Sequence, residues 1–206
     1  IIFLHFITKF KKLRIIIFMD KNKKGPLLEK LLKLGCFKTG DFTLKSGEKS
    51  SYYIDFRCLV SHPKILMEVC DLIYYKMPKT DVKICGLPYA GIPYAQTVSI
   101  MYQRSNILLR KEAKKHGTGK MIEGDFISGD DLIIIDDILT RGTSILESLE
   151  HLKDFNIKKI IVVLDRGEGG KKRLEEMGYQ VESVFSISEF IGTNSLVNCK
   201  LYQCNK

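Results

Sequence analysis

Two adjacent carboxylates lie close to a run of hydroxyl residues in the segment IIIDDILTRGTS, Ile133 to Ser144. Three isoleucines precede Asp136 and Asp137, and the polar turn Thr140 to Ser144 leads into residues with helical apolar spacing. Backbone N–H groups of a turn at a helix start bind anions, and hydroxyl groups add donors. We therefore expect a phosphate at the turn, with the two acids accepting hydrogen bonds from ribose hydroxyls and supporting a magnesium ion. An ordinary strand-to-helix connection with a threonine cap is the alternative, and this spacing makes it the weaker one.

A second candidate is the basic segment RKEAKKHGTGKMIEG, Arg110 to Gly124, which follows a short apolar run. A solvated loop is the usual interpretation of such a run of charge. Its cations could instead neutralise a phosphorylated group, and they are Arg110, Lys111, Lys114, Lys115, His116 and Lys120.

Arg166 in VVLDRGEGG is a candidate for binding a carboxylate, because the planar guanidinium pairs with a carboxylate at two points. The alternative for Arg166 is a surface ion pair with Glu168. Tyr52 and Tyr53 stand side by side in SSYYIDFR, shortly after Lys45 in FTLKSG. Either tyrosine could line a ring-binding site or simply pack into the core.

The elements that must position these residues alternate between helical and strand periods. We expect helices at 27–34, 65–77, 92–102, 143–155 and 171–177, and strands at 42–47, 50–57, 82–87, 106–110, 131–136, 158–165 and 181–187. Apolar strands separated by helices predict an α/β fold with a parallel sheet covered on both faces. Ligands of such sheets bind outside the carboxyl ends of the strands, where every motif above falls. The segment 111–124 shows no apolar period and is expected to be a polar loop.

Composition limits the class of protein. A chain of 206 residues with 45% hydrophobic content suits one domain. The six cysteines form no CxxC pair, which favours a reduced, cytoplasmic protein. Most of the net charge of +9 lies in residues 1–24, where seven Lys and Arg face one Asp. The nearly balanced remainder does not require nucleic acid as a partner.

Residues 1–18 are apolar at both ends and basic in the middle. Such a stretch is a poor membrane span, which needs about 20 mainly apolar residues, and it lacks a secretory cleavage site. We expect an extension at 1–18 outside the catalytic fold, a catalytic domain at 19–206 and no membrane partner. An interfacial amphipathic anchor is the second interpretation.

The segment Ile133 to Ser144 resembles the phosphoribosyl pyrophosphate (PRPP) motif of type I phosphoribosyltransferases, although Arg141 stands where that family commonly has a small residue. The order Arg-Lys-Glu-x-Lys-x-His-Gly from Arg110 is similar to the mobile catalytic loop of orotate phosphoribosyltransferases, which purine-specific members lack. FTLKSG, the tyrosine pair and VVLDRGEGG resemble further segments of that family. GLPYAGIP fits as well, with Ala90 where some members have lysine. The resemblance runs from Pro26 to Ile191.

This resemblance implies the type I phosphoribosyltransferase fold: a central, mainly parallel sheet flanked by helices, with a small N-terminal hood segment and a mobile catalytic loop. It implies transfer of the 5-phosphoribosyl group from PRPP to orotate, giving orotidine 5′-monophosphate and pyrophosphate in pyrimidine biosynthesis. The implied cofactor is Mg²⁺, held mainly by PRPP near Asp136 and Asp137.

The resemblance also assigns roles to individual residues. The implied catalytic residues are Lys111, Lys114, Lys115, His116, Asp136 and Asp137. The implied PRPP contacts are Arg110, Lys45, Asp136, Asp137, Thr140, Arg141, Gly142, Thr143 and Ser144. The implied orotate contacts are Lys45, Tyr52, Tyr53, Thr140 and Arg166.

The implied assembly is a homodimer in which the loop Lys111 to Gly124 of one subunit covers the site of the other. One alternative is a phosphoribosyltransferase for another base, such as a purine. The basic loop and Arg166 make this alternative less favoured. A second is a regulator of the same fold that binds RNA, which would need a basic face on the folded body. The chain is too short to include a decarboxylase barrel of about 250 residues, so decarboxylation of the product would need a separate chain, unless this chain is an excised portion.

Overall fold

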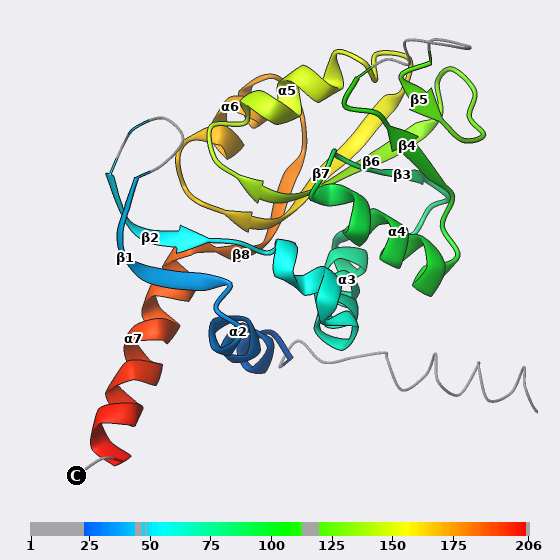
Figure 1. Ribbon diagram of the computed structural model, residues 1–206. Helices are drawn as coiled ribbons and strands as arrows, with labels where there is room; N and C mark the ends of the chain where they lie inside the picture. The colour runs from blue at the N-terminus through cyan, green and yellow to red at the C-terminus, as the bar shows by residue number, and fades with distance from the viewer. Residues whose placement is uncertain (1–22, 44–46, 48, 113–119, 205–206) are drawn as a thin grey trace, which may run out of the picture.

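The computed structural model describes residues 23–43, 47, 49–112 and 120–204, with only the helical backbone from 196 onward. Its main sheet has six strands in the order β5-β4-β3-β6-β7-β8 (Figure 1). These are β3 (Lys83–Gly86), β4 (Asn106–Leu109), β5 (Ile122–Glu123), β6 (Asp131–Leu139), β7 (Asn156–Asp165) and β8 (Val181–Ser186). Neighbouring strands pair in parallel except β5, which is antiparallel to β4. The expected mainly parallel sheet is confirmed.

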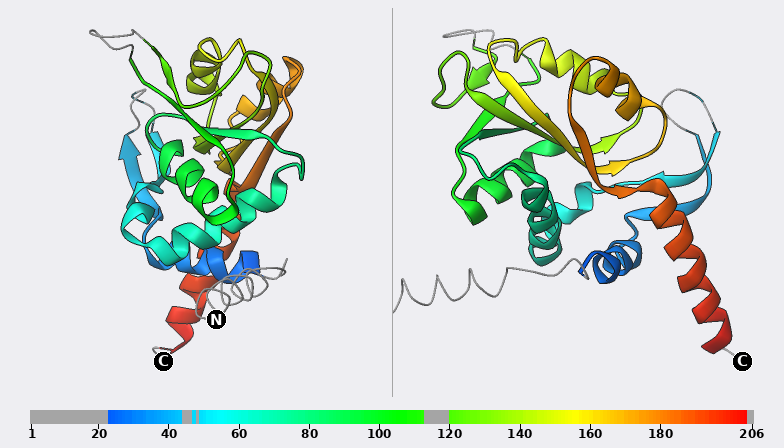
Figure 2. Two further views of the ribbon diagram at one scale, coloured as in Figure 1. Left: turned by 90° about the vertical axis from the view of Figure 1, so that its right-hand side faces the viewer. Right: turned by 180° about the vertical axis from the view of Figure 1, so that it is seen from behind.

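Helices cover both faces of this sheet (Figure 2). Ile133 and Ile135 of β6 belong to one buried cluster with residues of α3 (Pro63–Lys76) and α4 (Gly91–Tyr102). Their neighbours Leu132 and Ile134 belong to a second cluster with residues of α5 (Thr143–Leu149) and α6 (Gly170–Glu176). Successive strand residues point to opposite faces, so a continuously apolar strand such as β6 is buried on both sides.

A small hairpin stands apart from the main sheet and corresponds to the expected hood. It pairs β1 (Phe37–Thr43) with β2 (Lys49–Ile54) in antiparallel fashion. Phe37 stacks on Tyr52 with ring centroids 5.6 Å apart and lies 5.8 Å from Phe190. The first of these aromatic contacts lies within the hairpin, and the second fastens it to the start of α7 (Ile187–Cys204), beside α2 (Lys24–Lys33).

Several predicted boundaries were wrong, for reasons of pairing and packing. The strand expected at 131–136 continues to Leu139, because Ile138 and Leu139 pair with Leu164 and Asp165 of β7. The helix expected at 143–155 ends at Leu149, since a turn then buries Leu152 and Phe155 in the core.

At the hood, the strand expected at 42–47 begins earlier, at Phe37, where pairing with Ile54 starts. The strand expected at 50–57 ends at Ile54, and Arg57 opens a 3-10 helix, η2 (Arg57–Ser61). The helix α7 was not predicted at all.

Four cysteines whose side chains are described are free thiols: Cys36, Cys58, Cys70 and Cys85. Burial raises the pKa of Cys85 to about 12, so this thiol stays protonated at neutral pH. None of the helices in the described part of the chain is long and apolar enough to cross a membrane. Residues 1–18 lie outside the described residues.

Candidate active site

Four loops meet at one edge of the main sheet because they follow the carboxyl ends of parallel strands. They follow β3, β4, β6 and β7, and they contain GLPYAGIP, the basic segment, the hydroxyl turn and VVLDRGEGG. The candidate site is therefore at this edge.

The two acids lie inside strand β6, near its carboxyl end, rather than after the strand. Asp136 is buried, at 8% exposure, and Asp137 is half-buried. Asp136 Oδ1 accepts the N–H of Asp137 at 2.9 Å, and Asp137 Oδ1 accepts the N–H of Ile138 at 2.7 Å. Burial, followed by the charge of Asp137, raises the pKa of Asp136 to about 8, and burial also raises the pKa of Asp137. Hydroxyl donors or a cation at this point would favour the ionised carboxylates.

The hydroxyl turn opens α5 and presents its polar groups to solvent. Gly142 has φ +76°, a left-handed conformation that glycine adopts without strain, and it immediately precedes the helix. Among the described residues no side chain caps this helix start, while the flanking Thr143 and Ser144 are exposed and Thr140 is half-buried. Backbone N–H groups at the start of α5 are thus available to an anion such as a phosphate.

The loop after β7 is joined directly to the hydroxyl turn. The N–H of Arg166 donates to the carbonyl of Leu139 at 2.9 Å, and that of Gly170 donates to the carbonyl of Thr140 at 3.0 Å. A Cβ atom on Gly170 would lie 2.3 Å from the Thr140 carbonyl oxygen, which is closer than real contacts allow. These backbone bonds and the close approach at Gly170 therefore fix the distance between loop 165–170 and the hydroxyl turn.

Arg166 lies in this loop with its side chain only 14% exposed. One guanidinium NH2 is 2.9 Å from Glu168 Oε1, and the guanidinium carbon lies 5.2 Å from the ring centroid of Tyr52. Its Nε is buried and has no hydrogen-bond partner among the described residues. The ion pair with Glu168 does form, but it belongs to a mostly buried arginine rather than to an exposed one.

The two tyrosines point in opposite directions, as successive residues of a strand do. Tyr52 faces Arg166 and Phe37, whereas Tyr53 lies 5.5 Å from Phe42 and accepts a hydrogen bond from Arg57 at 3.1 Å. The structure thus brings Tyr52 to Arg166 and places Tyr53 on the other face of the hairpin.

Arg57 is a residue near the site that sequence reasoning missed. It pairs with Asp55 through Nε at 2.8 Å and NH2 at 2.9 Å, and this hydrogen bonding lowers the pKa of Asp55. The positive charge of Arg57 also opposes the rise in the pKa of Asp137. The signal in the sequence was the acid and base two residues apart, a spacing at which an aspartate side chain bonds the backbone N–H two residues on, as Asp55 does with Arg57 at 2.9 Å.

The ends of the basic loop are anchored in the sheet. Arg110 donates its N–H to the carbonyl of Met121 at 2.8 Å and pairs with Glu123 at 3.0 Å. Met121 and Ile122 pack against the core, so the expectation of a polar loop over 111–124 was wrong for its final residues. Their apolar side chains continue the hydrophobic face of β4 once β5 pairs with it.

Lys111 is the one described residue among the four basic residues expected to be catalytic. Its Nζ lies 5.3 Å from the ring centroid of Tyr89, an exposed residue in the turn after β3, next to Ala90. The remaining three, Lys114, Lys115 and His116, and also Lys45, lie outside the described residues.

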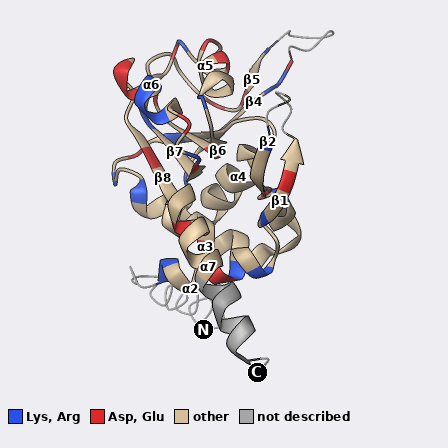
Figure 3. Ribbon diagram, turned by 90° about the vertical axis from the view of Figure 1, so that its left-hand side faces the viewer, with Lys and Arg blue, Asp and Glu red and all other residues tan. Residues whose placement is uncertain are grey.

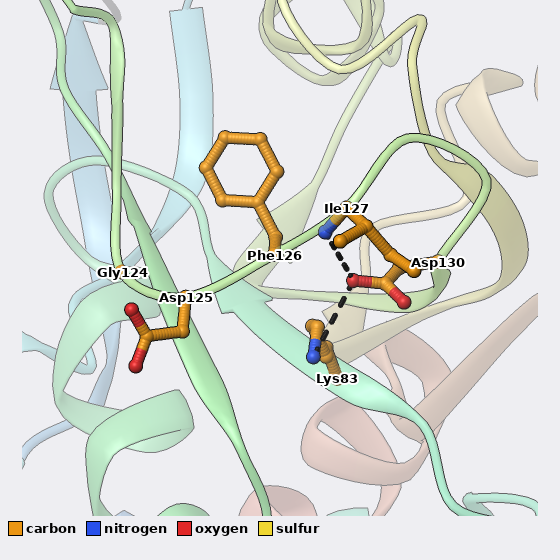
Figure 4. A pocket seen from close by; sticks show the side chains of 6 residues that line it. All are labelled: Lys83, Gly124, Asp125, Phe126, Ile127 and Asp130. Carbon is orange, nitrogen blue, oxygen red and sulfur yellow. Dashed lines mark hydrogen bonds and ion pairs between the residues drawn. The ribbon is translucent and has the colours of Figure 1, made fainter.

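A shallow pocket of about 410 Å³ lies toward the opposite edge of the sheet (Figure 4). It is lined by Lys83, Gly124, Asp125, Phe126, Ile127 and Asp130. Asp130 accepts the N–H of Ile127 at 2.8 Å and lies 3.4 Å from Lys83 Nζ, so Lys83 and Asp130 already pair with each other. Lys83 begins β3, which puts the pocket at the amino end of the strands and outside the candidate site.

Asp136 and Asp137 suit a metal ion that enters the site bound to a substrate. Within the described ranges, no three His, Cys, Asp or Glu side chains are grouped as a metal site would require. The adjacent Asp136 and Asp137 supply only two carboxylates, and magnesium commonly takes one or two protein carboxylates together with substrate phosphates. The residues present therefore fit a magnesium ion carried by a phosphorylated substrate.

Comparison with known proteins gives one consistent result. Residues 58–191 match the model of the phosphoribosyl transferase domain family. The chain is 34% identical over 174 residues to the orotate phosphoribosyltransferase of Methanocaldococcus jannaschii, covering 84% of this chain and 99% of that protein.

Solved structures agree with this match. The orotate phosphoribosyltransferase of Aeropyrum pernix has a TM-score of 0.73 at 31% identity, covering 82% of this chain and 98% of that one. The UMP synthase of Leishmania donovani has a TM-score of 0.75 at 34% identity, covering 85% of this chain but only 39% of that longer one.

Proposed function

The chain belongs to the phosphoribosyltransferase family, and from this premise we infer that it transfers the 5-phosphoribosyl group from PRPP to orotate. The products are orotidine 5′-monophosphate and pyrophosphate, and the reaction is a step of pyrimidine biosynthesis. The observation that carries the assignment is the pair of backbone hydrogen bonds joining loop 165–170 to Leu139 and Thr140. They place a mostly buried arginine, suited to a carboxylate, beside a turn suited to a phosphate.

An assay with PRPP and magnesium tests this assignment against other bases. Orotate should be turned over, whereas hypoxanthine and uracil should give less than about 1% of that rate, because neither has a carboxylate to pair with Arg166. Pyrophosphate release measures the reaction. Preference for hypoxanthine would contradict the assignment and support the purine alternative.

Charge placement accounts for the proposed chemistry. Breaking the bond between the anomeric carbon and pyrophosphate leaves positive charge on the ribose and negative charge on the departing oxygens. Asp136 and Asp137 hold the ribose hydroxyls, and the turn Thr140 to Ser144 holds the 5′-phosphate. Preorganised donors aimed at the negative charge that develops on the departing pyrophosphate contribute about 3 kcal/mol each. Magnesium, which we propose as cofactor, would be held by PRPP near the two acids and would neutralise the pyrophosphate charge.

The leaving group also needs cations from the chain. We propose Lys111, Lys114, Lys115 and His116 for this role. Lys111 already lies at the turn after β3, where Ala90 supplies no charge of its own. Arg110, by contrast, is engaged with Glu123 and would reach PRPP only if this ion pair opened.

Base recognition falls to the other side of the site. Arg166 pairs with the orotate carboxylate while Tyr52 supports the guanidinium, and Lys45 and Thr140 complete the contacts. Tyr53 lies on the opposite face of the hairpin, beside Arg57, so it would reach the base only if the hairpin rearranged. This arrangement orients the ring nitrogen of orotate toward the anomeric carbon.

Gly170→Ala should move loop 165–170 away from the hydroxyl turn. The added Cβ would lie 2.3 Å from the Thr140 carbonyl oxygen and 2.8 Å from the Gly142 nitrogen, so the loops must move apart. We expect a loss of roughly 1–3 kcal/mol in stability and about a tenfold fall in kcat/KM for both substrates. Thermal unfolding and steady-state kinetics measure these effects.

Gly178→Ala is the control for this substitution. Gly178 has φ +93°, so alanine is strained there, but a Cβ at that position has no atom within 4 Å. It should lower stability without changing KM for either substrate. Unchanged kinetics in Gly170→Ala would show that the contact between the loops does not matter for catalysis.

The RNA-binding alternative has less support. In the view of Figure 3, basic and acidic residues are interspersed over the helices and strands. Many of the cations are paired, as Lys159 is with Glu182 at 2.6 Å and Lys30 with Glu68 at 2.7 Å. Electrostatic binding of a polyanion favours clustered basic residues.

We further propose that decarboxylation of the product takes place on a separate chain or on a segment beyond this sequence.

A further inference from the structure

The loop that carries Arg166 also carries an acid with no role in the reaction described above. Glu168 Oε1 lies 2.9 Å from an NH2 group of Arg166, and the Glu168 side chain is 32% exposed. We propose that Glu168 is a positioning residue for orotate: it holds one edge of the Arg166 guanidinium so that the remaining donors face the orotate carboxylate. This inference rests on the proposed function, because it assumes that Arg166 binds the base.

Two contacts together restrict the guanidinium. The Tyr52 ring lies 5.2 Å from its central carbon and limits movement toward the hood, while Glu168 forms an ion pair with one NH2 group at 2.9 Å. A guanidinium has five N–H donors, so one ion pair leaves several of them for a ligand. The Nε is buried and lacks a partner among the described residues, so the guanidinium is only partly satisfied by the chain itself.

The backbone around Glu168 is held in place as well. Asp165 Oδ1 accepts the N–H of Gly167 at 2.9 Å, and the N–H of Gly170 donates to Thr140. Gly167 and Gly169 flank Glu168 with φ values of +70° and +86°, which residues other than glycine rarely adopt. The acid is therefore presented from a turn of defined shape, unlike a side chain on a freely moving surface loop.

An opposite role for Glu168 is conceivable on charge alone. A second carboxylate beside Arg166 would repel orotate, and its removal would then tighten binding. The geometry favours positioning, because Arg166 is mostly buried and a buried cation without its partner would rearrange or draw in water. The two roles predict opposite changes in the KM for orotate.

Three substitutions of Glu168 separate these roles in the full chain with PRPP and magnesium. Glu168→Ala should raise KM for orotate about five- to tenfold and change KM for PRPP less than about twofold. Glu168→Gln keeps an oxygen acceptor at the same reach and should stay within about threefold of the unaltered protein. Glu168→Asp is one methylene shorter and should fall between them. Glu175→Ala, which removes an exposed partner of Lys171 at 3.8 Å, is the matched control and should change neither constant.

The outcomes distinguish failure of this inference from failure of the base-site assignment. A KM for orotate that is unchanged or lowered in Glu168→Ala, or a rise that is equal for PRPP, overturns the positioning role. Arg166→Lys is measured in the same assay: if it too leaves orotate binding unaffected, the assignment of the base site fails. If Arg166→Lys weakens orotate and Glu168→Ala does not, only the inference about Glu168 fails. Should Glu168→Ala fold poorly, Glu168→Gln and Glu168→Asp still test the positioning role. That role requires the aspartate variant to bind orotate more weakly than the glutamine variant.

Discussion

Arg166→Lys is expected to raise KM for orotate about 30- to 100-fold while leaving KM for PRPP within about twofold, a loss of roughly 2–3 kcal/mol at the base site alone. The guanidinium meets a carboxylate at two points, whereas an ammonium offers one compact charge on a flexible stem. Arg166 also lies against Tyr52 and pairs with Glu168, contacts that a lysine would not reproduce in the same geometry. Steady-state kinetics with each substrate varied in turn measure the effect.

Arg104→Lys controls for the loss of an arginine as such. Arg104 is also largely buried, donates to the carbonyl of Thr80 at 3.1 Å, and lies beside α3 and α4, away from the loops at the carboxyl edge. Its substitution should lower stability without a selective effect on orotate. Equal damage to both substrates in Arg166→Lys would remove Arg166 from the base site.

A refolded mixture of two nearly inactive variants, Lys114→Ala and Asp137→Asn, should recover about a quarter of the original activity. We propose a homodimer in which Lys114 acts on the partner's site and Asp137 acts within its own chain. A mixed dimer then has one site with both substitutions and one site with neither. Random pairing makes about half of the dimers mixed, and half of their sites are intact. Activity after joint unfolding and refolding is compared with each variant treated alone.

The matched control combines Asp136→Asn with Asp137→Asn. Both acids lie on β6 of one chain, so every site in a mixed dimer keeps one substitution and no activity should return. Absence of recovery in the Lys114→Ala and Asp137→Asn mixture, once mixed dimers are demonstrated, would contradict the shared site. The orotate assignment would remain, because it depends on residues of a single chain.

The parts of the site that could be predicted from the sequence are those built by neighbouring residues. An apolar strand ending near two acids and a turn with hydroxyl groups is a local arrangement, and the structure has it at Asp136, Asp137 and Thr140 to Ser144. Period and turn chemistry act over a few residues, so such a segment can be interpreted without its surroundings. The boundaries were less certain, since β6 extends to Leu139 only because β7 pairs with it there.

Contacts between distant segments could not be predicted in this way. Nothing local to Tyr52 and Tyr53 indicates which of the two faces Arg166, because alternation fixes only that they differ. The hairpin's packing on Phe190 places Tyr52 inward. Likewise, the bond between Gly170 and Thr140 joins residues about 30 positions apart, and the burial of the Arg166 side chain also depends on distant segments.

The sequence by itself therefore determined the α/β fold, the order of its elements apart from β5 and α7, and the chemical type of each motif, because these follow from short-range periodicity and residue type. Only the tertiary structure decided that Tyr52 rather than Tyr53 lies against Arg166, that the arginine paired with Glu168 is mostly buried, and that loop 165–170 is joined to the turn Thr140 to Ser144. The physical reason is that these features depend on which surfaces of separate strands and loops are buried together, and burial is a property of the whole packed chain.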